Sequence, residues 1–252
     1  MYKKTIITLL FIKLLTVTGM AYINDGLYLS TYMGASKSAN NTLFFKFQDQ
    51  DDLTYNARYD NKSFSDSHWW MAKFERWKNK KSVGIELIHH KIYLKNTNDI
   101  INNFSISDGY NLLYFNRGKQ INNHILRYGA GIVIAHPDIT ITGRDRFKTK
   151  GIKGLFLSGL SIKTDHEYIL YKHKTAIITL QTKLTASYAK IPISTNKNEY
   201  VIAPDYAIHI SIGYARLLPK KAKLKEKILF LTPLAYPKLV GKYILNTAFY
   251  PN

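Results

Sequence analysis

The sequence is informative first through what it lacks. It contains no cysteine, so disulfide bonds play no part in its fold, which is compatible with a secreted protein that relies on other interactions. After residue 21 no run of about 18 apolar residues occurs, which argues against a helical membrane span. Acidic residues are few, with 17 Asp and Glu against 36 Lys and Arg and a net charge of +19. This basicity indicates an anionic partner, either nucleic acid or lipid head groups.

The N-terminal residues have the pattern of a secretory signal peptide. Lys3 and Lys4 precede an apolar stretch, residues 6–17, and Gly19-Met20-Ala21 then gives a small-x-small cleavage pattern. A membrane anchor is the alternative, but the stretch is short and Lys13 interrupts it. We therefore interpret residues 1–21 as a signal peptide. Because a secreted bacterial chain rarely meets nucleic acid, we expect no nucleic-acid partner.

Eight segments of alternating apolar and polar residues follow, and they predict β-strands. Connections of alternating length, long and then short, join the segments. This pattern is typical of an up-and-down barrel in a bacterial outer membrane, where both termini are periplasmic and the long loops face outward. We predict an all-β, eight-stranded antiparallel transmembrane barrel over residues 22–218. The predicted strands cover 26–34, 68–77, 82–94, 108–117, 124–136, 153–163, 174–189 and 200–217.

The last predicted strand shows the two faces most clearly. Ile208, Ile210 and Ile212 alternate with His209 and Ser211, so one face suits lipid and the other suits a crowded polar interior. A soluble, lipocalin-like barrel would have the opposite pattern, with a polar outside and an apolar inside. The alternation favours the membrane barrel.

Four segments resemble a family of small proteobacterial outer-membrane β-barrel proteins of the eight-stranded type. They are residues 52–56 (Asp-Leu-Thr-Tyr-Asn), 84–93 (Gly-Ile-Glu-Leu-Ile-His-His-Lys-Ile-Tyr), 109–113 (Gly-Tyr-Asn-Leu-Leu) and 129–137, from Gly-Ala-Gly to His-Pro. The resemblance covers about residues 26–217. It implies the outer membrane of a Gram-negative bacterium and insertion by the barrel-assembly machinery, and it implies no particular reaction.

The C-terminal segment departs from this family. Such barrels usually end on an aromatic residue, whereas here the last strand is followed by a basic tail, residues 219–252, that Pro233, Pro237 and Pro251 interrupt. Proline disfavours both helix and central strand, so we predict a disordered extension or a segment lying against phospholipid head groups.

Charged residues with inward-facing positions form the main candidate site. We predict a salt-bridge network in the lumen that contains Glu75, Glu86, Arg117 and Arg127. A narrow barrel fills its interior with paired charges, so a structural network is the favoured interpretation. General acid-base chemistry is the alternative, with Glu86, His90 and His209 as weak catalytic candidates. A lipid A deacylase is one such enzyme, but no Gly-x-Ser-x-Gly motif is present.

A second candidate site lies in an outward loop. Its basic residues alternate and suit the phosphates of lipopolysaccharide. They are Arg144, Arg146, Lys148 and Lys150. We expect no metal, because the adjacent His89 and His90 would point to opposite faces of a strand. We also expect no cofactor.

The function that these patterns predict is non-catalytic. We expect a monomeric outer-membrane barrel with a structural role or a role in surface interaction through its long loops, whose partners are outer-membrane lipid and lipopolysaccharide. A lipid A-modifying enzyme and a small channel are the alternatives. Side chains can fill the interior of an eight-stranded barrel, which argues against the channel.

Overall fold

The computed structural model describes residues 21–65, 68–149 and 154–218. The predicted signal peptide, apart from Ala21, and the predicted tail lie outside the described residues. Within the described part of the chain, no helix is long and apolar enough to cross a membrane.

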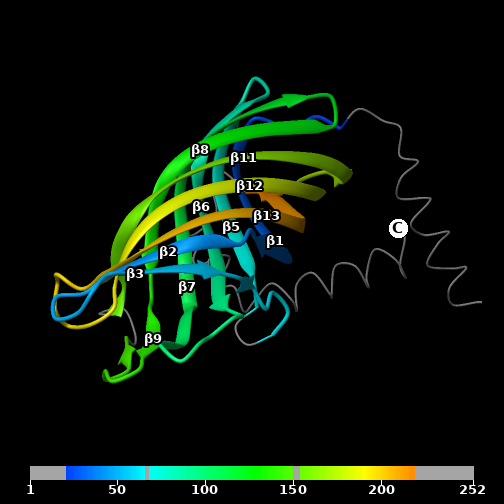
Figure 1. Ribbon diagram of the computed structural model, residues 1–252. Coiled ribbons are helices and arrows are strands. Elements are labelled where there is room, and N and C mark those ends of the chain that lie inside the picture. The colour runs from blue at the N-terminus through cyan, green and yellow to red at the C-terminus, as the bar shows by residue number, and fades with distance from the viewer. Residues whose placement is uncertain (1–20, 66–67, 150–153, 219–252) are drawn as a thin grey trace, which may run out of the picture.

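Eight long antiparallel strands form a closed barrel, as predicted (Figure 1). Each strand pairs with its neighbour in the chain, and the last strand closes the ring by pairing with the first along residues 28–38 and 207–217. The predicted fold class is therefore confirmed. The barrel strands are β1 (Gly26–Ser38), β5 (Trp70–Lys78), β6 (Lys81–Leu94), β7 (Ile101–Ile121), β8 (His124–Ala135), β11 (Phe156–His173), β12 (Ala176–Pro192) and β13 (Tyr200–Leu217).

β7 and β11 exceed their predicted lengths most. β7 extends to Ile121 and β11 to His173, so residues 164–173, which lie between two predicted strands, are part of a strand. Only two residues connect β5 to β6, β7 to β8 and β11 to β12. Asn79 and Lys80 both have positive φ, at 49° and 61°, as a tight hairpin turn matching the twist of its strands requires. We call the end with these turns and both described termini the short-turn end.

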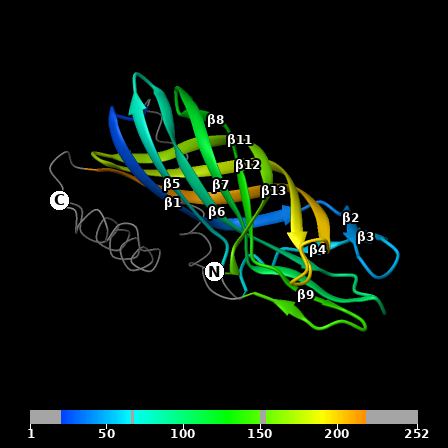
Figure 2. The ribbon, with the colours of Figure 1, turned by 90° about the vertical axis from the view of Figure 1, so that its left-hand side faces the viewer.

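The opposite end, which we call the loop end, has additional strands. These are β2 (Asn41–Lys46), β3 (Leu53–Ala57), β4 (Tyr59–Asp60), β9 (Asp138–Ile141) and β10 (Phe147–Lys148). β2 pairs with β13, β4 with β6 and β9 with β7, so the barrel wall continues into the loops (Figures 1 and 2). A cluster of buried apolar side chains that includes Leu43, Phe45, Phe104 and Val201 fills the space between these extensions.

The outer face of the barrel is apolar. Exposed large apolar side chains occur on all eight barrel strands, and Leu157, Leu160 and Ile162 are each more than 60% exposed. Water would disfavour such a belt, whereas the hydrocarbon of a membrane accepts it. The others on these strands are Leu27, Met33, Phe74, Val83, Ile85, Phe115, Ile121, Leu126, Tyr128, Leu180, Leu184, Tyr188, Tyr206, Ile208, Ile210 and Ile212.

The lumen is filled at the short-turn end. Ile23 lies inside the barrel mouth, where its backbone N–H donates a hydrogen bond to Gln120 Oε1 at 2.9 Å. It belongs to a buried cluster that also contains Tyr28, Trp77, Ile125, Ile169, Ile177 and Ala215. Apolar clusters therefore lie at both ends of the barrel, and the polar interior lies between them.

Candidate functional site

Eight charged side chains form one buried layer in the middle of the lumen. Five of the barrel strands contribute to it, because inward positions alternate along each strand. Each of these side chains is at most 2% exposed. Four are cationic and four are anionic, so the layer has no net charge. Its members are Lys73 and Glu75 on β5, Glu86 on β6, Arg127 on β8, Lys163, Asp165 and Glu167 on β11, and Lys183 on β12.

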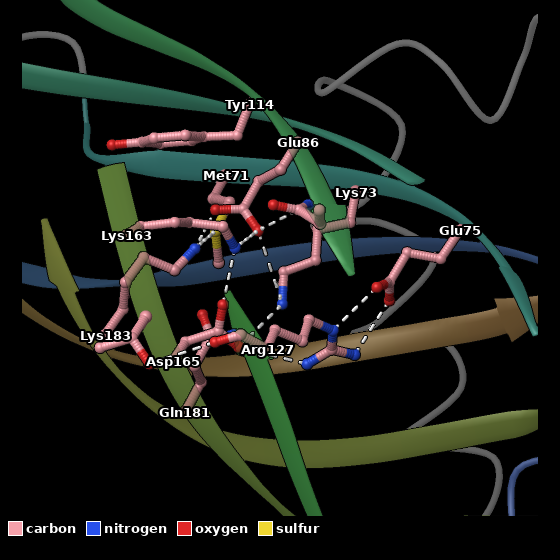
Figure 3. A network of polar contacts seen from close by, with 12 residues as sticks. Met71, Lys73, Glu75, Glu86, Tyr114, Arg127, Lys163, Asp165, Gln181 and Lys183 are labelled. Atoms are coloured by element: carbon pink, nitrogen blue, oxygen red, sulfur yellow. Dashed lines mark hydrogen bonds and ion pairs between the residues drawn. The ribbon is translucent and has the colours of Figure 1, made fainter. Parts of the chain in front are cut away.

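Arg127 joins three of the four carboxylates. Its guanidinium binds Glu75 in bidentate geometry, with Nε to Oε1 at 2.8 Å and Nη2 to Oε2 at 2.9 Å. Nη1 lies 3.3 Å from Asp165 Oδ1 and also contacts Glu167. Figure 3 shows the guanidinium with contacts to Glu75 on one side and towards Asp165 on the other. A planar fork of donors suits this arrangement better than a lysine would.

The three lysines complete the network around Glu86. Lys163 Nζ lies 2.7 Å from Glu86 Oε2 and 2.6 Å from Asp165 Oδ2. Lys183 also contacts Glu86 (Figure 3), and Lys73 Nζ lies 3.2 Å from Glu167 Oε2. Each carboxylate in the layer therefore has at least one cationic partner.

This arrangement is suited to structure rather than to proton transfer. A buried charge is costly unless it is paired and hydrogen-bonded, and here each charge is. A general acid or base needs a free path to a substrate atom. The Glu86 carboxylate is instead surrounded by the ammonium groups of Lys73, Lys163 and Lys183. The layer fills the cross-section with mutually bonded side chains.

The structure brings together three of the four residues in the predicted lumen network. Glu75, Glu86 and Arg127 belong to the layer, but Arg117 does not. Arg117 is exposed on the outer face, two residues along β7 from the outward-facing Phe115. β7 continues without a break to Ile121, so residues two apart share a face.

The predicted network lacked five of the eight residues in the layer. Lys73 and Lys183 lie on predicted strands but were not assigned to the network, and Lys163, Asp165 and Glu167 fall at or beyond the end of the strand predicted over 153–163. Their alternation with Ile162 and Thr164 was the available signal. A stretch as polar as residues 163–167 is typical of a loop. It is recognised as a strand only when the lumen that accommodates its charges is known.

The predicted catalytic candidates lie at two levels of the barrel. His90 and His209 lie in contact, with ring centroids 5.1 Å apart. Glu86 is four residues from His90 along β6, which is about 13 Å in a strand. Glu86 contacts lysines and belongs to the charged layer, so the three candidates do not form one site.

His90 instead meets two serines and an aspartate. Its Nε2 lies 3.1 Å from Asp205 Oδ2 and 3.2 Å from Ser38 Oγ, and its Nδ1 lies 3.2 Å from Ser36 Oγ. His209 Nε2 lies 3.1 Å from Thr185 Oγ1. The residue types of a hydrolase triad therefore meet on the loop-end side of the charged layer, although the His90 and Asp205 side chains are fully buried.

The predicted lipopolysaccharide residues are paired with carboxylates in the loops. Arg146 binds Asp138 through two bonds of 2.7 and 2.6 Å, and Lys148 Nζ lies 3.0 Å from the same carboxylate. Hydrogen bonding from Arg146, and then from Lys148, lowers the pKa of Asp138. The Arg146 side chain is 54% exposed and that of Lys148 is 36% exposed, so both also face solvent.

Arg144 links two other loops. Its Nη1 lies 2.6 Å from Glu199 Oε1, and its Nη2 contacts Asp49. Hydrogen bonds from Ser194, and then from Arg144, lower the pKa of Glu199. Lys150 lies outside the described residues. Within residues 21–65, 68–149 and 154–218, no group of three or more His, Asp or Glu residues could hold a metal ion.

Comparisons with known proteins found similar chains among solved structures only. No protein-family model and no curated protein sequence matches the chain. Among solved structures, it is similar to the outer membrane protein AlkL, at 10% identity with a TM-score of 0.46, over 82% of this chain and 97% of AlkL. It is also similar to Ail, the attachment invasion locus protein of Yersinia pestis, at 13% identity with a TM-score of 0.38, over 76% of this chain and 99% of Ail.

A third similar structure is the outer membrane protein OprG from Pseudomonas aeruginosa, at 12% identity with a TM-score of 0.34, over 77% of this chain and 97% of OprG. These likenesses concern the fold alone. The closed ring of eight strands and the apolar outer belt independently give the architecture of a membrane β-barrel. The chain is an eight-stranded β-barrel of the bacterial outer-membrane type.

Proposed function

We propose that the protein is a non-catalytic anchor that holds a rigid interaction surface at the outside of the outer membrane. The observation that carries this proposal is the neutral eight-residue layer, which fills the lumen between two apolar clusters. A filled lumen leaves the loop end as the part that can meet other molecules.

The loop end supports the proposal because it is folded. The β2–β3 hairpin adds to the β13 edge, and Arg144, between β9 and β10, forms ion pairs with Asp49 in the loop of this hairpin and with Glu199 just before β13. A pre-organised surface loses little conformational entropy on binding. We infer that Arg146 and Lys148 form its contact with lipopolysaccharide phosphates, since both are exposed beside a single carboxylate, Asp138.

Single-cysteine labelling tests the orientation of the barrel in the membrane. The natural sequence has no cysteine, so only the introduced cysteine can be labelled. Lys197 lies exposed in a connection at the loop end and Lys174 in a turn at the short-turn end. A membrane-impermeant maleimide added to intact cells should label K197C, and it should label K174C only after the outer membrane is permeabilised. The reverse pattern would contradict the proposal.

Planar-bilayer recording tests the closed lumen. The full chain should show no stable single-channel conductance, because the charged layer and the apolar clusters fill the barrel. A reproducible ohmic conductance would instead support the channel.

Acyl hydrolysis is the second candidate function, and the contacts of His90 favour it. Ser36 Oγ, His90 and Asp205 have the order of a nucleophile, a base and an orienting acid. If the protein is a non-catalytic anchor, lipid A mass spectra should be identical in cells that express the wild type, S36A or no protein. Loss of acyl chains with the wild type but not with S36A would establish the hydrolase.

A further inference from the structure

Five cations form a patch on the outer face of the barrel at the short-turn end. They lie in two rows across β5, β6 and β7. In the outer row, Lys81 lies opposite both Lys78 and Lys119. In the second row, Val83 lies between Arg76 and Arg117. We call these five residues the rim patch.

The rim patch is unneutralised. All five side chains are exposed, and among the described residues none of them makes a side-chain hydrogen bond or an ion pair. On these strands Glu75 and Glu86 point into the lumen, and Asp25, which accepts the backbone N–H of Asn79 at 2.9 Å in the β5–β6 turn, forms no ion pair with the patch in the described structure. Residues 219–252, which lie outside the described part, contain seven lysines and one acidic residue, Glu226, so their sequence offers little negative charge.

Like charges directly opposite one another in a sheet destabilise it. Directly opposite residues have Cβ atoms about 5 Å apart, so Lys81 repels a lysine on each side. An anion bound between the rows would remove this cost. A phosphate is the suitable anion, because Arg76 and Arg117 present guanidinium groups that bind its oxygens in bidentate geometry.

An apolar row borders the patch on the side of the membrane belt. Phe74, Ile85 and Phe115 lie side by side on the same face, and they are 39%, 53% and 56% exposed. They lie two residues from the arginine row, which is about 7 Å along a strand. This spacing places a charged head group and an acyl chain in contact with adjacent rows of one surface.

The patch is also confined to three strands. On β8, Leu126 and Tyr128 occupy the positions next to the two rows, and on β1 Leu27 lies next to Arg76. These neighbours are 49%, 64% and 40% exposed. The cations therefore form a bounded site rather than a uniform ring around the barrel mouth.

We propose that the rim patch binds an anionic glycerophospholipid of the inner leaflet of the outer membrane. This inference rests on the orientation in the proposed function, which places the short-turn end at the periplasmic side. Arg76 and Arg117 hold the phosphate, the lysine row contacts the remaining head group, and the acyl chains lie against Phe74 and Ile85. Head groups at this level are charged, and basic residues beside them bind anionic lipid preferentially.

Native mass spectrometry of the full chain, released from detergent micelles that contain phosphatidylglycerol, phosphatidylcholine or lipopolysaccharide, tests the inference. The wild type should retain phosphatidylglycerol in preference to phosphatidylcholine. R76Q/R117Q should weaken the apparent affinity for phosphatidylglycerol by about tenfold or more, which is the order expected for two removed surface cations. R76K/R117K keeps both charges and should retain most of the binding. Added salt should weaken binding by the wild type.

K95Q/K197Q is the matched control, because it removes two exposed cations at the loop end. A heat-dependent shift in gel mobility establishes that each variant is folded. Equal loss of lipid in the control, unchanged binding in R76Q/R117Q, or equal retention of phosphatidylcholine or lipopolysaccharide would overturn the inference. Cysteine labelling reports the orientation separately, so failure of lipid binding and failure of the proposed function are distinguishable.

Discussion

Replacing Arg127 with methionine gives a direct test of the charged layer. The substitution keeps an unbranched side chain in the lumen but removes the only cation that contacts Glu75 among the residues that the structure describes. Glu75 would then keep a single hydrogen bond, from Ser82 Oγ at 3.1 Å, and the layer would hold one uncompensated negative charge. Removal of one partner from a buried ion pair costs about 3–5 kcal/mol. We expect R127M to lower the free energy of unfolding by this amount.

Urea unfolding of the full chain in phosphatidylcholine vesicles measures this cost. The Arg127 guanidinium lies 5.7 Å from the Trp77 ring, so tryptophan fluorescence reports on the altered region. With a slope of about 2 kcal/mol per molar urea, the midpoint should fall by about 1.5–2.5 M. R117M is the matched control, because Arg117 faces outward, and it should change stability by less than about 0.5 kcal/mol.

A second variant separates the lost ion pair from lost packing. E75Q should destabilise the wild type but should partly restore R127M, because it removes the charge that R127M leaves unpaired. The coupling between the two substitutions should exceed about 1 kcal/mol. If R127M and R117M have equal midpoints, or if the two effects in the double variant simply add, the charged layer does not stabilise the barrel as argued.

Two further predictions concern the loops and the barrel wall. Because the folded-state pKa of Asp138 lies below the ordinary value of 3.8, the stability from its bonds is complete above that value and is lost as pH falls through the folded-state pKa. The protection factors of amides in β9 and β10, which correct for the intrinsic pH dependence of exchange, should therefore be high at pH 6 and lower near pH 2, and equal protection factors at both would refute this. A Cβ at Gly131 would lie 2.0 Å from the Leu113 carbonyl oxygen. G131A should therefore lower the unfolding free energy by about 1–3 kcal/mol. An unchanged urea midpoint would show that β7 and β8 can separate without cost.

Much of the fold could be predicted from the sequence because it depends on a local pattern. Alternation along 200–217 placed β13 at its observed bounds, and Ile208 and Ile210 are on the outer face as predicted. The predicted strand bounds were wrong where charged residues obscured the alternation of apolar and polar side chains. Asp165 and Glu167 on β11 looked like loop residues, because a strand that points carboxylates inward is stable only when cations on other strands meet them.

The sequence by itself determined that strands alternate, where two of the three tight turns fall and that the outside is apolar, since each follows from residues close together in the chain. Only the tertiary structure decided which charges meet. Closing eight tilted strands fixes a stagger between them, and that stagger brings residues of β5, β6, β8, β11 and β12 to one level. Unbroken alternation along β7 turns Arg117 outward, but only the pairing of β5, β6 and β7 places it across Val83 from Arg76 in the rim patch, because pairing between strands is a property of the closed barrel and not of any one strand.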